Sequence, residues 1–149
     1  MNALRLNPDC VRDVLLCVEE HTSLRKCAVF IDLDLHSQTA DILGLDDPEI
    51  PSFQKELMEQ YDCDELIYHI NYCAEAELIK LSDMTAGDAI WVADLTPKGH
   101  EFLANIREHN NWQKTKEISS KVGSAGISML GKIAEGVASA WMKQQLGLL

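Results

Sequence analysis

The sequence predicts an α+β fold, and two observations on residues 61–103 lead to this prediction. First, apolar residues recur three and four apart after Asp64, a residue type that caps helices, so a helix with one buried face is expected. Second, two short apolar runs, residues 78–81 and 89–95, are typical of β-strands, and Gly87 between them suits a hairpin turn because glycine tolerates a positive φ. A helix followed by a β-hairpin is therefore the centre of the expected fold.

Helices on both sides of this segment are also expected. Residues 53–61 suit a short helix, the first of a helix-turn-helix whose second helix follows Asp64. Pro97 suits the first turn of the next helix, because the N–H that proline lacks has no intrahelical partner there. A helix-turn-helix plus a β-hairpin is the element order of a winged helix. We therefore expect a winged-helix-like domain over residues 1–112 and a C-terminal helical extension over residues 113–149.

The N-terminal helix is expected to begin at Pro8, with Asn7 as its cap, and to end near Glu20. Its apolar stripe includes Cys10 and Cys17, which would lie roughly 10 Å apart along the helix, too far for a disulfide. The five cysteines of the chain are odd in number and form no C-x-x-C pair, which argues against a disulfide framework or a zinc knuckle. Core packing is the expected role of both residues.

Residues 28–35 end in alternating apolar and polar side chains, which predicts a strand with Asp32 and Asp34 on its solvated face. An apolar run that leads into D-x-D also resembles the first motif of haloacid-dehalogenase-type phosphatases, in which the two carboxylates help to bind Mg²⁺. Leu35-His36 stands where that motif has Gly-Thr, and the chain does not continue as repeated βαβ units. The solvated strand is therefore preferred over a hydrolase site.

Charge is distributed unevenly along the chain. The net charge is −11 in total, with −14 on residues 1–95 and +3 on residues 96–149. Duplex DNA is held mainly by Lys and Arg side chains that neutralise phosphates. Between Asp64 and Leu95 only Lys80 has that chemistry. We therefore expect a protein partner for this region, and nucleic acid is not expected. An acidic surface of this kind could also imitate nucleic acid toward a basic partner.

The helix after Asp64 carries Tyr68, His69 and Tyr72, which are the residues expected to contact a partner. Cys73 follows His69 by four residues, a spacing that could place two metal ligands on one helix. Third and fourth ligands are not evident apart from His100. A hydrogen-bonded histidine near the core is therefore the preferred interpretation, and no metal, cofactor or catalytic residue is expected.

The last segment reads as a strongly amphipathic helix that begins near Gly123. Glycines such as Gly131 and Gly136 weaken an isolated helix by about 1 kcal/mol each, so this helix is expected to need a partner surface. The chain's own core, a second copy, another protein or a membrane could supply it, and the few lysines make the membrane the weakest choice. A homo-oligomer is preferred, with the contact residues Ile127, Leu130, Ile133, Val137 and Trp141.

No stretch of the sequence reaches the roughly 18 uncharged apolar residues of a membrane span. The N-terminus also lacks the apolar segment of a signal peptide. A cytoplasmic protein without a membrane partner is therefore expected.

Several segments together resemble an uncharacterised family of small bacterial and prophage proteins, a domain of unknown function that looks related to YjcQ-like winged-helix proteins. One departure is Glu77, where the family usually has glycine. The resemblance implies a winged-helix-like fold and a prophage or mobile-element setting, and it transfers no catalytic or binding residues. The segments that carry it are residues 6–16, 68–70, 75–76, 95–103, 106–107 and 112–116.

These observations predict a non-enzymatic protein-interaction module that regulates or inhibits host machinery. The alternative is a DNA-binding transcriptional regulator, whose DNA contacts would have to come from residues outside the usual recognition helix. A hydrolase built on Asp32 and Asp34 is a distant third interpretation. The basic residues that the alternative requires are Lys98, Arg107, Lys114, Lys116 and Lys121.

Overall fold

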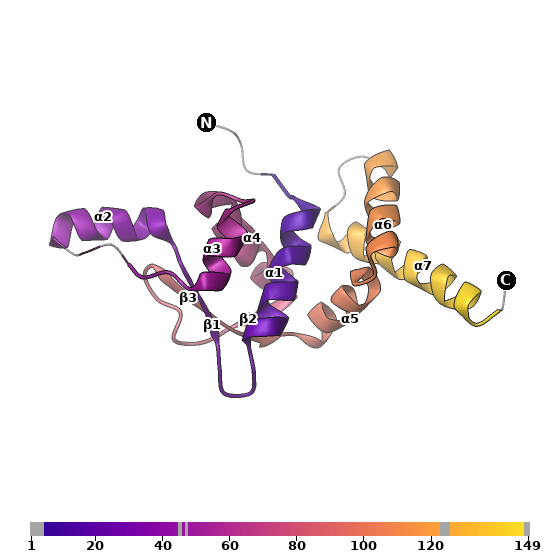
Figure 1. Cartoon of the computed structure of the whole chain (residues 1–149), viewed down its shortest axis with the longest axis horizontal. Helices are drawn as coiled ribbons and strands as arrows, with labels where there is room; N and C mark the ends of the chain where they lie inside the picture. The colour runs from indigo at the N-terminus through magenta and orange to yellow at the C-terminus, as the bar shows by residue number, and fades with distance from the viewer. Residues whose placement is uncertain (1–4, 45, 47, 123–125, 148–149) are drawn as a thin grey trace. The chain divides into compact units, whose positions relative to one another are not determined.

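A computed structural model describes residues 5–44, 46, 48–122 and 126–147, and the chain divides into two compact units, Met1–Thr96 and Pro97–Leu149. The first unit contains helices and a small sheet, and the second contains helices in its described part (Figure 1). The α+β class is therefore confirmed. The division falls after Thr96, whereas the sequence analysis placed the end of its first region at residue 112.

The sheet of the first unit has three antiparallel strands in the order β1-β3-β2. The central strand, β3, places Val92 opposite Ala28 of β1 and Ile90 opposite Phe30. All four side chains are buried, so the sheet contributes one face to the core. The helices and strands of this unit are α1 (Pro8–His21), β1 (Ala28–Ile31), α2 (Leu33–Leu43), α3 (Ser52–Met58), α4 (Cys63–Glu75), β2 (Ile79–Leu81) and β3 (Ala89–Leu95).

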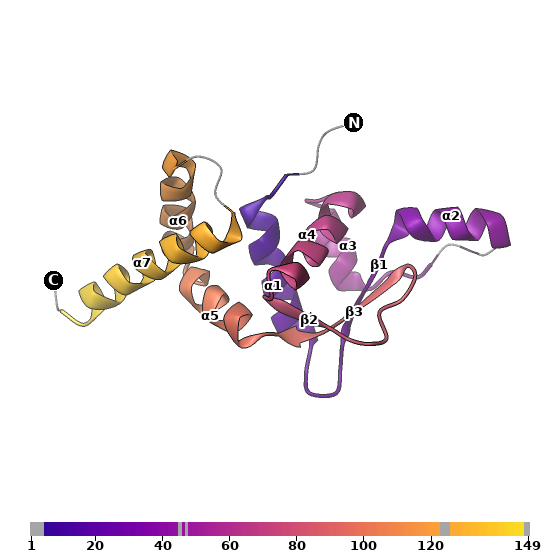
Figure 2. The same ribbon diagram turned by 180° about the vertical axis from the view of Figure 1, so that it is seen from behind.

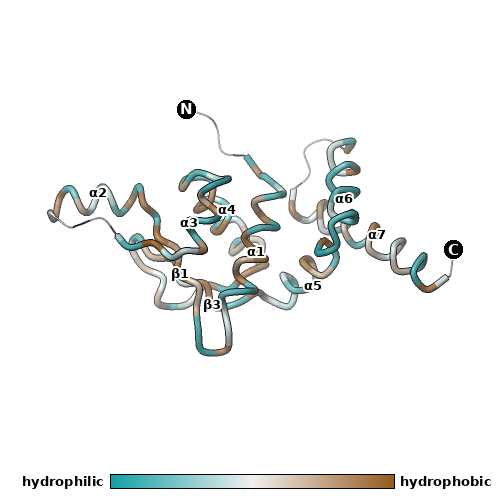
Figure 3. Tube along the Cα trace, in the orientation of Figure 1, coloured by the Kyte–Doolittle hydropathy of each residue, from teal (hydrophilic) through white to brown (hydrophobic). Residues whose placement is uncertain are grey.

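Helix α1 begins as the sequence predicts. The Asn7 side chain accepts hydrogen bonds from the backbone N–H groups of Asp9 and Cys10, and Pro8 occupies the first turn. Hydrophobic residues recur along the helix (Figure 3). Cys10 and Cys17 are both buried, which confirms their expected place in the core.

Helices α1 and α4 pack together over the sheet, and α4 lies in front of α1 in the view of Figure 2. Leu15 of α1 and Leu66 and Ile70 of α4 are completely buried. Full burial of such a side chain stabilises a fold by about 1.5–3 kcal/mol. The apolar spacing that the sequence shows in both helices is therefore the main source of the core.

The expectation of a strand over residues 28–35 is wrong beyond Ile31. Strand β1 ends there because its partner strand begins at Ala89, the residue that pairs with Ile31. Asp32 still donates its backbone N–H to the carbonyl oxygen of Asp88, at 2.7 Å, and its side chain then accepts from the N–H of Leu35. Asp32 is therefore the N-cap of α2, and it does not lie on a strand face.

Helix α3 is joined to the sheet by one buried polar side chain, Gln54. Its amide oxygen accepts from the N–H of Ile31 at 2.9 Å, and its amide nitrogen donates to the carbonyl oxygen of the same residue at 2.8 Å. Because β1 is an edge strand, this pair of bonds satisfies backbone groups that no neighbouring strand reaches. Phe53, Leu57 and Met58 are all half-buried, and Gln54 is the fully buried residue of the helix.

Helix α4 begins and ends with residues that the sequence analysis did not assign to these roles. Asp62, rather than Asp64, caps it by accepting from the N–H of Glu65 at 2.8 Å. At its end, Glu77 adopts a φ of 62°, in the left-handed region. The N–H groups of Glu77 and Leu78 reach back to the last turn, which is the Schellman motif that usually places glycine at this position.

The hairpin and the following helix agree with the sequence. Gly87 has a φ of 61° in the turn between β2 and β3, and Ala86 and Ala89 form a bridge beside it. Helix α5 begins at Pro97, as expected. The Thr96 hydroxyl donates to the carbonyl oxygen of Glu77, so the end of β3 is tied to the end of α4.

The second unit consists, in its described part, of α5 (Pro97–Ile106), α6 (His109–Val122) and α7 (Ile127–Gln145). Helix α6 begins at His109, and the Glu108 carboxylate just before it accepts from the N–H of Asn111 in its first turn. The buried apolar residues of this unit include Phe102, Leu103, Ile106, Trp112, Leu130, Ala134 and Val137. Within the described part of the chain, no helix combines the length and apolar character needed to cross a membrane.

Replacement of Gln54 by leucine is expected to lower the free energy of unfolding by about 2–3 kcal/mol, because the N–H of Ile31 loses its partner and the carbonyl of Ile31 keeps only the weak contact with the Cys63 thiol at 3.8 Å. Urea denaturation followed by circular dichroism measures this change. Gln60→Leu, at an exposed position just beyond the same helix, is the matched control. A loss in Gln54→Leu no larger than in the control would contradict this role.

Replacement of Glu77 by glycine is expected to stabilise the chain by about 0.5–1 kcal/mol, because a side chain at positive φ is strained and glycine is not. Thermal unfolding would show this as a higher Tm. Glu75→Gly, inside α4, is the control and is expected to lower the Tm. A lower Tm for both variants would contradict the assignment of strain to Glu77.

Candidate functional site

The residues predicted to contact a partner on α4 divide into two groups. Tyr68 and Tyr72 are half-buried, and their ring centroids lie 6.2 Å apart on the helix surface. His69 is completely buried. The structure therefore brings the two tyrosines together at the surface, and it removes His69 from the set of residues that reach a partner in this conformation.

His69 has a structural role that its hydrogen bonds define. Its Nε2 atom lies 2.8 Å from the backbone nitrogen of Asn7, which is a donor, so Nε2 accepts and the ring proton is on Nδ1. Nδ1 in turn donates to the carbonyl oxygen of Glu65 at 2.7 Å. The imidazole thus connects the start of α1 to α4, as expected for a hydrogen-bonded histidine near the core.

The exposed face of α4 is acidic. Asp64 and Glu75 are exposed, and no Lys or Arg occurs between Cys63 and Glu75. The pKa of the Asp64 carboxyl is raised by a hydrogen bond with Asp34 of α2 and by the negative charge of that residue. Two carboxyl groups from different helices therefore meet at this surface.

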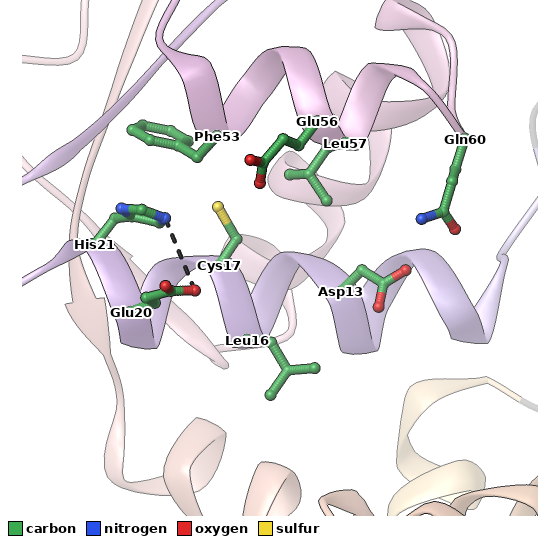
Figure 4. Close-up of a pocket in the computed structure, with 9 residues that line it drawn as sticks. All are labelled: Asp13, Leu16, Cys17, Glu20, His21, Phe53, Glu56, Leu57 and Gln60. Atoms are coloured by element: carbon green, nitrogen blue, oxygen red, sulfur yellow. Dashed lines mark ion pairs between the residues drawn. The ribbon is translucent and has the colours of Figure 1, made fainter.

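A groove lies between α1 and α3, and we call it the α1–α3 groove (Figure 4). Its volume is about 220 Å³. The lining residues recur three and four apart on each helix, so one face of α1 and one face of α3 form its walls. They are Asp13, Leu16, Cys17, Glu20 and His21 from α1, with Phe53, Glu56, Leu57 and Gln60 from α3 and the residues just after it.

The groove combines an apolar interior with a carboxylate rim. The His21 ring stacks on Phe53 with centroids 4.5 Å apart. Burial, followed by the charges of Glu20 and Glu56, raises the pKa of the Cys17 thiol to about 12. This thiol is therefore neutral near pH 7 and is not an activated nucleophile. Figure 4 shows it directed toward α3, with Glu56 and the His21 ring on either side.

The groove could not be predicted from the sequence for a specific reason. Cys17 was assigned to the core, and the periodicity of residues 53–61 did not indicate that Gln54 would be the side chain that fixes α3. One sequence feature nevertheless indicated an additional apolar surface on α1, because Leu16 widens the apolar stripe beyond the arc that one helix can bury. Acidic residues flank it on the same face.

The contact residues predicted on α7 also divide into groups. Leu130 and Val137 are buried inside the second unit, so they pack against the chain itself. Ile127 and Ile133 are half-buried, and Trp141 retains 40% of its accessible surface. Met142 and Leu146, in the last turns, are exposed as well. Leu130 and Val137 are therefore covered and the last turns of α7 are open, while Met129 near the start of the helix retains 43% of its accessible surface.

The structure does not assemble the other groups that the sequence suggested. Asp32 caps α2, and Cys73 is completely buried beside a histidine whose two ring nitrogens are both engaged. Among the residues that the structure describes, no three His, Cys, Asp or Glu side chains are grouped so as to hold a metal ion. The five basic residues of the DNA-binding alternative all lie in the second unit, on α5 and α6 or between them.

Comparison with known proteins identifies a family. A family model described as a hypothetical protein, DUF2513, matches residues 5–125. No curated protein and no solved structure matches the chain. The matched region covers the described part of the first unit together with α5 and α6, which confirms the resemblance to an uncharacterised family. The chain therefore belongs to the DUF2513 family of hypothetical proteins.

Proposed function

We propose that this chain is a non-enzymatic protein-interaction module of prophage or mobile-element origin that regulates or inhibits host machinery. The observation that carries the proposal is the charge of the first unit. Residues 1–96 hold six Lys and Arg against 20 Asp and Glu, a net charge of −14. Such a surface repels nucleic acid and attracts basic proteins.

A winged-helix-like architecture for the first unit is part of the proposal. Helices α3 and α4 follow one another with a short connection, as in a helix-turn-helix, and the hairpin of β2 and β3 comes next. Strand β1 adds a third strand to this hairpin. In this interpretation α4 occupies the position of a recognition helix.

The chemistry of α4 favours a protein partner over DNA. Insertion into the major groove would bring Asp64 and Glu75 close to phosphates without any compensating cation on the helix. Tyr68 and Tyr72, in contrast, are side chains of the kind that are enriched in protein interfaces. The same helix therefore suits a polypeptide surface.

Self-association through α7 completes the proposal. The exposed Trp141, Met142 and Leu146 form an apolar end on α7, a helix in which Leu130 and Val137 are already buried. Contact with a second copy at this end would remove apolar surface from water. The homo-oligomer expected from the sequence would then use the end of α7, together with the half-buried Ile127 and Ile133.

A DNA-binding transcriptional regulator is the second candidate, and the charge of the second unit favours it. Residues 97–149 hold seven Lys and Arg against four Asp and Glu, a net charge of +3. Phosphate contacts would then come from α5 and α6 rather than from α4. Lys114 and Lys121, both exposed on α6, are suitable for such contacts.

An electrophoretic mobility shift assay with random duplex DNA at about 50 mM salt separates the two candidates. Protein at about 10 µM is expected to leave the DNA free, because α4 repels phosphates. A retained band that disappears in the variant Lys114→Gln/Lys121→Gln would contradict the protein-interaction proposal and support the regulator. Gln113→Ala, at an exposed neutral position on the same helix, is the control.

Light scattering coupled to size exclusion tests the oligomer. The full chain is expected to show a mass above 16.7 kDa, the mass of one copy, at about 50 µM. The variant Trp141→Gln/Leu146→Gln is expected to weaken association by roughly tenfold or more, because it removes exposed apolar surface. The control variant Gln144→Ala/Gln145→Ala changes two exposed polar residues in the same turns. A monomeric mass for the unmodified chain would contradict self-association.

A further inference from the structure

We propose that the α1–α3 groove is the binding site for a basic segment of a partner protein, and that an arginine side chain of this segment enters it. This inference rests on the proposed function and adds to it a location and a partner chemistry. It follows from three properties of the groove, which are its size, its apolar interior and the carboxylates on its rim.

The size of the groove fits an anchoring side chain. Sites that enclose a whole small molecule commonly have volumes of ~300–1,000 Å³. The α1–α3 groove, at about 220 Å³, is smaller than this range. Protein interfaces place much of their binding energy in a few anchors, often Trp, Tyr or Arg, that fill pockets of one partner. A groove of this size therefore suits one such anchor.

The interior of the groove fits the aliphatic stem and planar head of arginine. Leu57 and Phe53 are half-buried, and they offer apolar surface to the methylene groups of the stem. The Phe53 and His21 rings stack on each other, and guanidinium groups favour aromatic neighbours. The Cys17 thiol, which is neutral because burial raises its pKa, adds no opposing charge.

The charge on the rim selects a cation. Asp13, Glu20 and Glu56 contribute three carboxylates, and among the described residues that line the groove there is no Lys or Arg. Asp13 accepts a hydrogen bond from the Tyr61 hydroxyl at 2.6 Å, which holds it in place. Glu20 and Glu56 are exposed on opposite helices, and the Glu20 carboxylate lies 3.9 Å from Nε2 of His21 (Figure 4), so a guanidinium between the helices would have these two carboxylates as partners.

The flanking surface indicates that the arginine belongs to a basic segment. Leu16 extends the apolar wall along α1, and the first unit as a whole has a net charge of −14. An isolated guanidinium would contact only the groove, whereas a segment with further Arg or Lys side chains and an apolar face gains from the surrounding acidic surface as well.

The test uses the full chain and fluorescence anisotropy. The probe is a fluorescein-labelled amphipathic peptide of about 12 residues that carries leucines and arginines on one face. The variant Glu20→Gln/Glu56→Gln is expected to weaken binding by about tenfold, because it removes two of the rim carboxylates. The control variant Glu59→Gln/Glu75→Gln removes the same charge from exposed positions that do not line the groove, and is expected to weaken binding by less than about twofold.

Two further comparisons make the result specific. A peptide with lysine in place of arginine is expected to bind less tightly, because an ammonium does not form the same planar contacts. The NMR amide shifts caused by the arginine peptide are expected to concentrate on α1 and α3. Equal losses in the two protein variants, shifts centred on α4 or α7, or no binding of the arginine peptide would each overturn the groove proposal. None of these outcomes involves DNA binding, so the groove proposal can fail without contradicting the proposed function. The mobility shift assay tests the proposed function separately.

Discussion

The two hydrogen bonds between the Gln54 side chain and the backbone of Ile31 are the constraint on which the first unit depends. They hold a short helix against the exposed edge of β1, where a neighbouring strand would otherwise be needed. A seven-residue helix has little stability of its own, so α3 is fixed by this attachment and by its half-buried apolar residues. The position of α3 beside α1 in turn creates the groove that we assign to a partner.

The same unit shows how polar residues can define a fold without becoming an active site. His69 connects the start of α1 to α4, and Asp32 and Asp62 cap α2 and α4. Each of these residues belongs to a type that enzymes use. Here their polar atoms are engaged with backbone groups, which explains their presence structurally. Exposed acidic residues such as Glu56, Asp64 and Glu75 contribute to the strong negative charge of the first unit.

The sequence predicted the elements that have a clear periodicity or a specific turn chemistry. Helix α1, the hairpin with Gly87 and the start of α5 at Pro97 were all expected, because local residues determine them. The sequence did not predict the elements whose structure depends on contacts between residues that are far apart in the chain. Whether Asp32 continues a strand or caps a helix depends on where β3 begins, and whether Gln54 is buried depends on the edge of β1. The groove was missed because it needs two helix faces to be placed side by side.

The central claim is that the acidic first unit meets proteins and leaves nucleic acid unbound. Ultraviolet cross-linking in cells that express the chain tests it most directly, because Tyr68 and Tyr72 lie together on the surface of α4, the helix that we propose to occupy the recognition position. Our account predicts that peptides containing these tyrosines are recovered without nucleotide adducts. Recovery of nucleotide adducts on either tyrosine would contradict it.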